Sequence, residues 1–229
     1  MKKINTAIFW ISLIGLFIVY SSFGALKGVF TKNKQAALLQ AMRAWGKCLL
    51  KVNHITYEVE GLEKIDPNKS YIFAANHQSI IDILFLAAII PVPFIFMVKK
   101  TLFKVPLFGY YMKKAGFISV DRKNPKKDYQ IIMKTIRDNP INILIFPEGT
   151  RSYDGSLGVF KSGVAKFAEL TQFPTIPISV SGTIDIMNRG NLKITPGKVI
   201  AKVGDPIFWD GNKKDYLTAL REEIRANIT

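Results

Sequence analysis

Residues 71–82 read Tyr-Ile-Phe-Ala-Ala-Asn-His-Gln-Ser-Ile-Ile-Asp, and this stretch decides the fold of the chain. Its first five residues form a short apolar run of the kind that makes a β-strand. Residues 79–90 form a longer apolar run that can wind into a helix. A polar segment that contains His77 and Asp82 therefore lies where a strand passes into a helix.

A histidine and a carboxylate at close range are the ingredients of general-base catalysis. The carboxylate fixes the tautomer of the base and stabilises its imidazolium. The chain has two histidines, so any histidine base is His77 or His54. On one continuous helix, His77 and Asp82 would point about 140° apart. We therefore expect His77 in the loop and Asp82 in the first helical turn, where the helix dipole favours the ionised carboxylate. Alternatively, Asn76 or Ser79 caps the helix and His77 is a surface residue.

Two downstream segments repeat this arrangement of a β-prone run followed by polar residues. They are residues 116–122, which end in Asp-Arg, and residues 141–152, which contain Phe-Pro-Glu-Gly-Thr-Arg. Residues 176–180 form a third apolar run, which contains a proline. In open α/β sheets, ligands collect where the strands end. The internal Pro177 of the third run predicts an edge or bulged strand.

Taken in order, these segments resemble the four motif blocks of the glycerolipid acyltransferase family. The blocks are Asn76-His77-x4-Asp82, Phe117 with Arg122, Phe146 to Arg151, and Ile176-Pro177. The resemblance spans roughly residues 57–205 and is closest to the 1-acylglycerol-3-phosphate acyltransferases, which acylate lysophosphatidic acid. One departure is Thr101, where members of this family often carry a glutamate.

The resemblance implies a role for each matching residue. His77 is implied as the base and Asp82 as its partner, while arginine guanidinium groups can clamp a phosphate through paired donors. Glu148 is expected either to contact the glycerol hydroxyl of the acceptor or to pair with an arginine, and Gly149 to supply a tight turn. The substrate-binding residues predicted with this resemblance are Arg122, Glu148, Gly149, Arg151 and Lys104. Lys161 lies outside the motif blocks, just beyond a flexible loop, and either reaches the phosphate site or is a solvated lysine.

The same residues favour direct attack by the acceptor hydroxyl, without an acyl-enzyme. Ser79 lies near His77, but no Gly-x-Ser-x-Gly elbow surrounds it. Cys48 is the one cysteine and is expected to be a buried or lipid-facing small hydrophobe, so no disulfide or CxxC-type metal site is predicted. We expect no metal and no cofactor, with acyl-ACP or acyl-CoA as co-substrate. The apolar residues of 80–86 and 94–97 can line an acyl tunnel or simply fill the core.

Charge and hydropathy predict a membrane as partner. The net charge of +15 favours an anionic surface, and no nucleic-acid-binding signature is found, so nucleic acid is not expected. Residues 4–26 carry no charge and are long enough to cross a bilayer, and residues 34–52 form an amphipathic helix. Residues 4–26 either span the membrane once or dip into the inner leaflet as half of a hairpin. The basic residues beyond them predict an inner-membrane protein whose catalytic domain faces the cytoplasm.

We therefore predict an α/β fold with a central mixed sheet flanked by helices, preceded by an N-terminal membrane-associated two-helix segment. Residues 1–53 are the predicted anchor and 54–229 the acyltransferase domain. The expected activity is acyl transfer to the sn-2 hydroxyl of lysophosphatidic acid, giving phosphatidic acid. The alternatives are another lysolipid acceptor or a non-catalytic lipid-binding protein. Strands are expected near 56–60, 71–75, 93–98, 117–120, 141–146, 175–180, 192–195 and 198–203, and helices near 79–90, 104–114, 126–138, 161–170 and 214–227.

Overall fold

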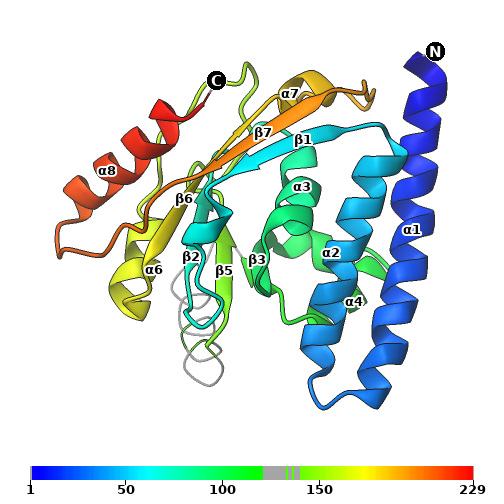
Figure 1. Cartoon of the computed structure of the whole chain (residues 1–229), viewed down its shortest axis with the longest axis horizontal. Coiled ribbons are helices and arrows are strands. Elements are labelled where there is room, and N and C mark those ends of the chain that lie inside the picture. Colours follow the sequence, from blue (N-terminus) through cyan, green and yellow to red (C-terminus); the bar gives the residue numbers. More distant parts are fainter. Residues whose placement is uncertain (1, 121–132, 134–135, 137–139, 229) are drawn as a thin grey trace.

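A central sheet organises the molecule (Figure 1). The structure is a computed structural model that describes residues 2–120, 133, 136 and 140–228. Over these residues the strands form one seven-stranded sheet in the order β1-β7-β6-β2-β5-β3-β4. All neighbours are parallel except β6 and β7, which are antiparallel. The strands are β1 (Thr56–Glu60), β2 (Ile72–Ala75), β3 (Phe94–Lys99), β4 (Ile118–Val120), β5 (Asn142–Ile145), β6 (Thr175–Ser181) and β7 (Lys198–Val203).

Helices cover both faces of this sheet, which confirms the predicted α/β class. Figure 1 shows α6 and α8 on one side and α1, α2, α3 and α4 on the other. The strands β2, β5 and β6 are buried along their whole length, as expected of central strands that are covered on both faces. The helical segments are α1 (Lys2–Phe30), α2 (Lys34–Val52), η1 (Leu62–Lys64), α3 (Ile81–Ile89), η2 (Lys100–Lys104), α4 (Phe108–Lys114), α6 (Gly163–Thr171), α7 (Thr183–Ile186) and α8 (Lys213–Ala226).

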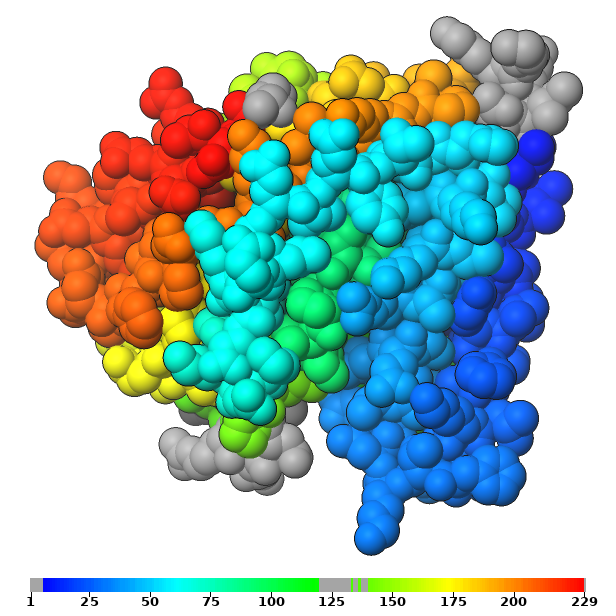
Figure 2. All heavy atoms as spheres, in the orientation of Figure 1, coloured from blue at the N-terminus to red at the C-terminus, as the bar shows by residue number. Residues whose placement is uncertain are grey.

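The first two helices form an antiparallel hairpin along one side of the molecule (Figures 1 and 2). Its turn ends at Asn33, whose side chain accepts a hydrogen bond from the Ala36 N–H at 2.9 Å and so caps α2. Two glycines let the helices approach closely. A methyl group at Gly24 would lie 2.7 Å from Ala41 Cβ, and one at Gly46 would lie 2.7 Å from a carbonyl oxygen of α3. The helix α2 therefore packs directly on both α1 and α3.

The helix α1 has two different faces. Towards the protein, Phe9 is fully buried in the core, and Phe17 makes edge contacts with Phe108 and Tyr111 of α4. The opposite face exposes large apolar side chains, and the stretch Thr6–Phe30, which contains an 18-residue window with a mean hydropathy of 1.9, is long and apolar enough to cross a membrane. The most exposed of these side chains are Ile11, Ile14, Val19, Phe23, Leu26, Val29 and Phe30.

Several predicted elements differ from the observed ones. No strand forms at 192–195, which is an irregular segment before β7. The helix expected at 104–114 is observed only from Phe108 as α4, because Val105 precedes Pro106 and takes an extended conformation that ends the preceding η2. The short helix α7 was not expected. The helix predicted at 126–138 lies almost wholly outside the described residues.

Pro177 was predicted to mark an edge or a bulged strand, and the edge alternative is wrong, because its strand, β6, is central and lies between β2 and β7. The bulged alternative agrees with the pairing, since the register shifts by one residue between the pair Ile178–Val203 and the bridge Thr175–Ile207. The β7 ladder pairs residues 178–181 of β6, and a separate bridge joins Thr175 to Ile207. Pro177 lies between these two sets of bonds, so its missing N–H interrupts no regular ladder.

Candidate active site

The loops that follow β2, β5 and β6 meet at one edge of the sheet. These strands are adjacent and parallel, so their carboxyl ends point the same way. Asn76, the first residue after β2, donates to the Val180 carbonyl at 2.8 Å and accepts from the Val180 N–H at 2.7 Å. This buried pair of bonds ties the loop that carries His77 to the end of β6. Asn76 is thus used to join strands and does not cap the helix.

His77 and Asp82 form a hydrogen-bonded pair, in the arrangement expected from the sequence. His77 lies in the loop, and Asp82 is the second residue of α3. His77 Nδ1 lies 2.8 Å from Asp82 Oδ2, and the carboxylate is fully buried. The same oxygen accepts hydrogen bonds from the N–H groups of Gln78 and Ser79, at 2.7 and 2.8 Å. Because Nδ1 faces the carboxylate, Nε2 is the ring nitrogen that a substrate can reach.

Two further contacts hold this pair, and sequence reasoning missed both. Thr183, in α7, donates its hydroxyl hydrogen to Asp82 Oδ1 at 2.5 Å. The Phe146 ring stacks on the His77 imidazole, with centroids 3.9 Å apart and an interplanar angle of 15°. In the sequence, Thr183 could have been noticed only as a polar residue that follows an apolar run, two residues beyond the end of β6. Its contact with Asp82 could not be predicted, because no local pattern indicates that β6 lies beside β2.

Glu148 joins the loop after β2 to the segment after β5. Its Oε1 accepts a hydrogen bond from the His77 N–H, and its Oε2 accepts one from the Gly158 N–H, both at 2.8 Å. No pairing with an arginine is found within the described residues, so the second of the two expected roles is not observed. Burial raises the pKa of Glu148 above its ordinary value, and the two backbone hydrogen bonds oppose that rise. Glu148 therefore acts on the position of the His77 backbone.

The other predicted site residues are not all brought together. Gly149 has φ of 67°, which is the tight turn that was expected, and a methyl group there would lie 2.8 Å from Lys161 Nζ. Lys161, near the end of the segment that joins β5 to α6, thus folds back onto the turn at Gly149. Lys104 is exposed at the end of η2 and does not line the pocket described next. Arg122 lies outside the described residues.

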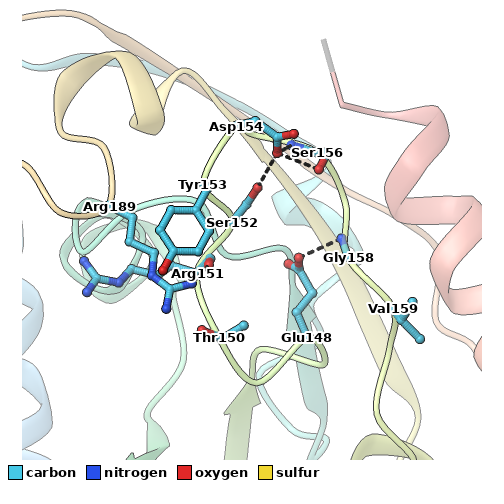
Figure 3. A pocket seen from close by; sticks show the side chains of 10 residues that line it. All are labelled: Glu148, Thr150, Arg151, Ser152, Tyr153, Asp154, Ser156, Gly158, Val159 and Arg189. Carbon is cyan, nitrogen blue, oxygen red and sulfur yellow. Dashed lines mark hydrogen bonds between the residues drawn. The ribbon is translucent and has the colours of Figure 1, made fainter.

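An open pocket of about 480 Å³ lies beside this loop (Figure 3). Ser152, in its wall, donates its N–H to the His77 carbonyl at 2.8 Å, so the pocket adjoins the histidine. Two guanidinium groups lie on one side of it, from Arg151 and from Arg189, a residue that sequence reasoning missed. Within the described residues, no group of three His, Cys, Asp or Glu side chains is placed to hold a metal ion. The pocket is lined by Glu148, Thr150, Arg151, Ser152, Tyr153, Asp154, Ser156, Gly158, Val159 and Arg189.

Fold and site define an α/β protein with a histidine–carboxylate pair and an arginine-lined pocket at the carboxyl ends of its strands. The sequence model of the Acyltransferase family matches residues 56–181, more than half of the chain, and the chain belongs to that family. The family resemblance drawn from the four motif blocks is therefore confirmed.

Named relatives show the same likeness. The chain is 29% identical over 177 residues to the sheep (Ovis aries) 1-acyl-sn-glycerol-3-phosphate acyltransferase alpha, a match that covers 76% of this chain and 62% of the relative. It is 30% identical over 190 residues to the 1-acyl-sn-glycerol-3-phosphate acyltransferase of Limnanthes douglasii, covering 80% and 67%. The chain thus spans about three fifths of the length of the mammalian relatives.

A solved structure shares the fold. The crystal structure of the 1-acyl-sn-glycerophosphate (LPA) acyltransferase PlsC from Thermotoga maritima superposes with a TM-score of 0.85. It is 24% identical in sequence, and the match covers 99% of this chain and 97% of that one. Its coverage includes the N-terminal hairpin, so the hairpin belongs to the shared architecture.

Proposed function

We propose that the protein is a 1-acylglycerol-3-phosphate acyltransferase, which transfers a fatty acyl group from a thioester carrier to the sn-2 hydroxyl of lysophosphatidic acid. The observation that carries the proposal is the pair of a partly exposed His77 and a buried Asp82 beside an arginine-lined pocket. Relatives with this activity in their names support the choice of acceptor. The donor is acyl-ACP or acyl-CoA, used as a co-substrate, and no cofactor or metal is proposed.

The reaction needs a base, and His77 is suited to be one. The acceptor oxygen attacks the thioester carbonyl while its proton passes to Nε2 of His77. The tetrahedral intermediate then expels the thiolate, which takes that proton from the imidazolium. Asp82 stabilises the imidazolium between these steps. A positioned base of this kind is typically worth about 10² to 10⁴ in rate.

The environment of Ser79 supports direct attack. Its hydroxyl is fully buried and donates to the Met187 carbonyl at 2.5 Å, so it faces away from substrate. A serine nucleophile would need its hydroxyl hydrogen bonded to the base. The acceptor hydroxyl is therefore the nucleophile in our proposal, and no acyl-enzyme forms.

We assign the acceptor phosphate to the pocket beside the histidine. Arg151 lines it and offers paired N–H donors that match phosphate oxygens. Lys161 approaches the same loop, and its ammonium adds positive charge. Arg122 stays in the proposal on the strength of its motif block alone. Lys104 is exposed away from this pocket, so a substrate contact of Lys104 has no support from the geometry.

We further propose that the hairpin lies in the cytoplasmic leaflet of the inner membrane. The helix α2 packs along α1, so a spanning α1 would draw charged residues of α2 towards the hydrocarbon. Each such charge costs about 2.5 to 3.5 kcal/mol at the bilayer centre on insertion scales. Arg43 also donates to the Ala88 and Pro91 carbonyls, which ties α2 to the α/β domain. A hairpin that dips into one leaflet avoids that cost and leaves the site beside the lipid acceptor.

One assay tests the activity. Thiol release from acyl-CoA and from acyl-ACP is measured with lysophosphatidic acid, other lysolipids and monoacylglycerol as acceptors. We expect transfer to lysophosphatidic acid, a loss of at least about 10²-fold in His77→Ala, and no such loss in the matched variant His54→Ala. Arg151→Ala should weaken use of lysophosphatidic acid more than use of monoacylglycerol, and Arg151→Lys should rescue only in part. Preference for another lysolipid, or no thiol release, would overturn the proposal.

A second assay tests the membrane contact. Deleting residues 1–50 would remove core side chains such as Phe9 and Leu50, so surface substitutions are the sharper probe. Changing Ile11, Phe23 and Phe30 together to Ser should release the protein from vesicles that contain anionic lipid. Changing the equally exposed Phe208 to Ser, in the segment before α8, should not. Equal binding of both variants would contradict the proposed contact.

A further inference from the structure

Arg189 occupies a defined position beside Arg151, although it lies outside every motif block. Its Nη1 donates to the Arg151 carbonyl at 2.6 Å. Its guanidinium carbon lies 4.0 Å from the centroid of the Tyr153 ring, which is the geometry of a cation–π contact. Figure 3 shows this stacking at the mouth of the pocket. One hydrogen bond and one ring contact thus hold the guanidinium, and most of its five N–H donors are left for a ligand.

The segment that carries Arg189 is itself held in place. The Trp10 indole N–H donates to the Leu192 carbonyl at 3.1 Å, and the Ile194 N–H donates to the Thr6 hydroxyl at 3.2 Å. The Thr195 N–H donates to the Ile186 carbonyl at 2.9 Å. The loop between α7 and β7 is therefore fixed both to α1 and to α7 through its residues 192–195. Arg189 is placed by these anchors as well as by its own contacts.

The two carboxylates that line the pocket are used by other partners. Glu148 accepts two backbone N–H groups, as described above. Asp154 Oδ1 accepts from the Ser152 hydroxyl and from both the N–H and the hydroxyl of Ser156. Over the described residues, neither Arg151 nor Arg189 forms an ion pair with a carboxylate. Two guanidinium groups on one side of a pocket repel each other unless an anion lies between or beside them.

We propose that Arg189 is a second phosphate-binding guanidinium of the substrate site, held in position by Tyr153. This inference rests on the proposed acyl transfer and names a specificity residue beyond the motif blocks. The phosphate belongs either to the lysophosphatidic acid acceptor or to the pantetheine-bearing carrier. Both present the same oxygens to a guanidinium fork, and the pocket is large enough for a phosphorylated headgroup.

Steady-state kinetics on the full chain separates the two sources. In Arg189→Ala we expect the KM of the phosphate-bearing substrate to rise about tenfold, the effect of losing a charged hydrogen bond at an open site. The KM of Arg189→Lys should lie between those of the wild type and Arg189→Ala. Tyr153→Leu should raise the same KM less than Arg189→Ala does. Lys193→Ala is the matched control, because it removes an exposed cation from the same loop, outside the pocket.

Pairs of substrates that differ in the presence of a phosphate show which substrate carries the phosphate that Arg189 binds. A rise in KM for lysophosphatidic acid but not for monoacylglycerol assigns Arg189 to the acceptor. A rise for acyl-CoA but not for the acyl thioester of N-acetylcysteamine assigns it to the carrier. Equal losses with and without phosphate, a fall in kcat alone, or losses no larger than those of Lys193→Ala would overturn the inference. Thermal unfolding shows whether each variant is folded.

A binding measurement tests the role of Arg189 independently of the proposed acyl transfer. Calorimetric titration of the detergent-solubilised chain with glycerol 3-phosphate, and separately with coenzyme A, needs no turnover. Loss of binding of one probe in Arg189→Ala supports the inference, even if the wild type does not acylate lysophosphatidic acid. Unchanged binding of both probes in Arg189→Ala, in a protein that does acylate it, overturns the inference alone.

Discussion

Replacing Asp82 with Asn tests the central feature of the site. Asp82 is fully buried and accepts four hydrogen bonds, from the His77 ring, two backbone N–H groups and the Thr183 hydroxyl. An asparagine has nearly the same shape. Its oxygen can still accept from the two backbone groups, and its amide can donate to the threonine oxygen. The substitution therefore removes the negative charge while keeping most of the packing.

The expected loss follows from the charge interaction. In the proposed mechanism, a positive imidazolium forms with its charge about 4 Å from that of the carboxylate. At an effective dielectric constant of about 20, the attraction between two unit charges at that distance is about 4 kcal/mol. A loss of this size raises the barrier enough to slow the reaction by a factor of about 10³. We therefore expect kcat of Asp82→Asn to fall by roughly this factor, because the imidazolium that forms in the reaction loses the negative charge beside it.

The assay is acyl transfer to lysophosphatidic acid at saturating donor, with thermal unfolding measured on the same preparation. Asp185→Asn is the matched control, because Asp185 is exposed on α7, near the site, and the same atoms change. We expect that control to keep wild-type kcat. A folded Asp82→Asn protein with kcat within a few-fold of wild type would refute the role of the carboxylate, and so would an equal loss in Asp185→Asn.

Three further predictions follow from single contacts. Thr183→Val removes a buried donor to the catalytic carboxylate, so kcat should fall about 10- to 100-fold while Thr183→Ser stays near wild type; equal effects in both variants would count against a hydrogen-bonding role. Gly46→Ala should lower the free energy of unfolding by about 1 to 3 kcal/mol in urea titrations, because its methyl group would lie 2.7 Å from a carbonyl of α3, whereas Gly15→Ala, with open space around it, should not destabilise. The pKa of Glu148 is raised because burial opposes its charged form, so the stability that this group contributes is fully present below its ordinary value of 4.5 and is lost as the pH rises through the folded-state value. The stability difference between wild type and Glu148→Gln should therefore shrink as the pH rises from 4 towards 7, and a constant difference would contradict the raised pKa.

Local patterns in the sequence determined the main secondary-structure elements around the site and the long N-terminal helix. The apolar run before His77 and the longer one after it already predicted a strand, a loop and a helix, and the helical angle placed Asp82 in the first turn. The uncharged stretch at residues 4–26 predicted the long helix α1. These features depend on neighbouring residues, because backbone periodicity and helix geometry act over one or two turns. The ordered motif blocks added the family, which the comparisons confirmed.

Only the tertiary structure decided which distant residues complete the site. Glu148 meets the His77 backbone across 71 positions, and Thr183 meets Asp82 across 101. Both contacts exist because β2 lies between β5 and β6, and the strand order is not written in any local period. The same cause placed Pro177 in a central strand. An apolar run indicates that a strand is buried, because the hydrophobic effect depends on the area removed from water and not on direction. It does not indicate which strands lie beside it, because strand pairing is directional and depends on the packing of the whole sheet.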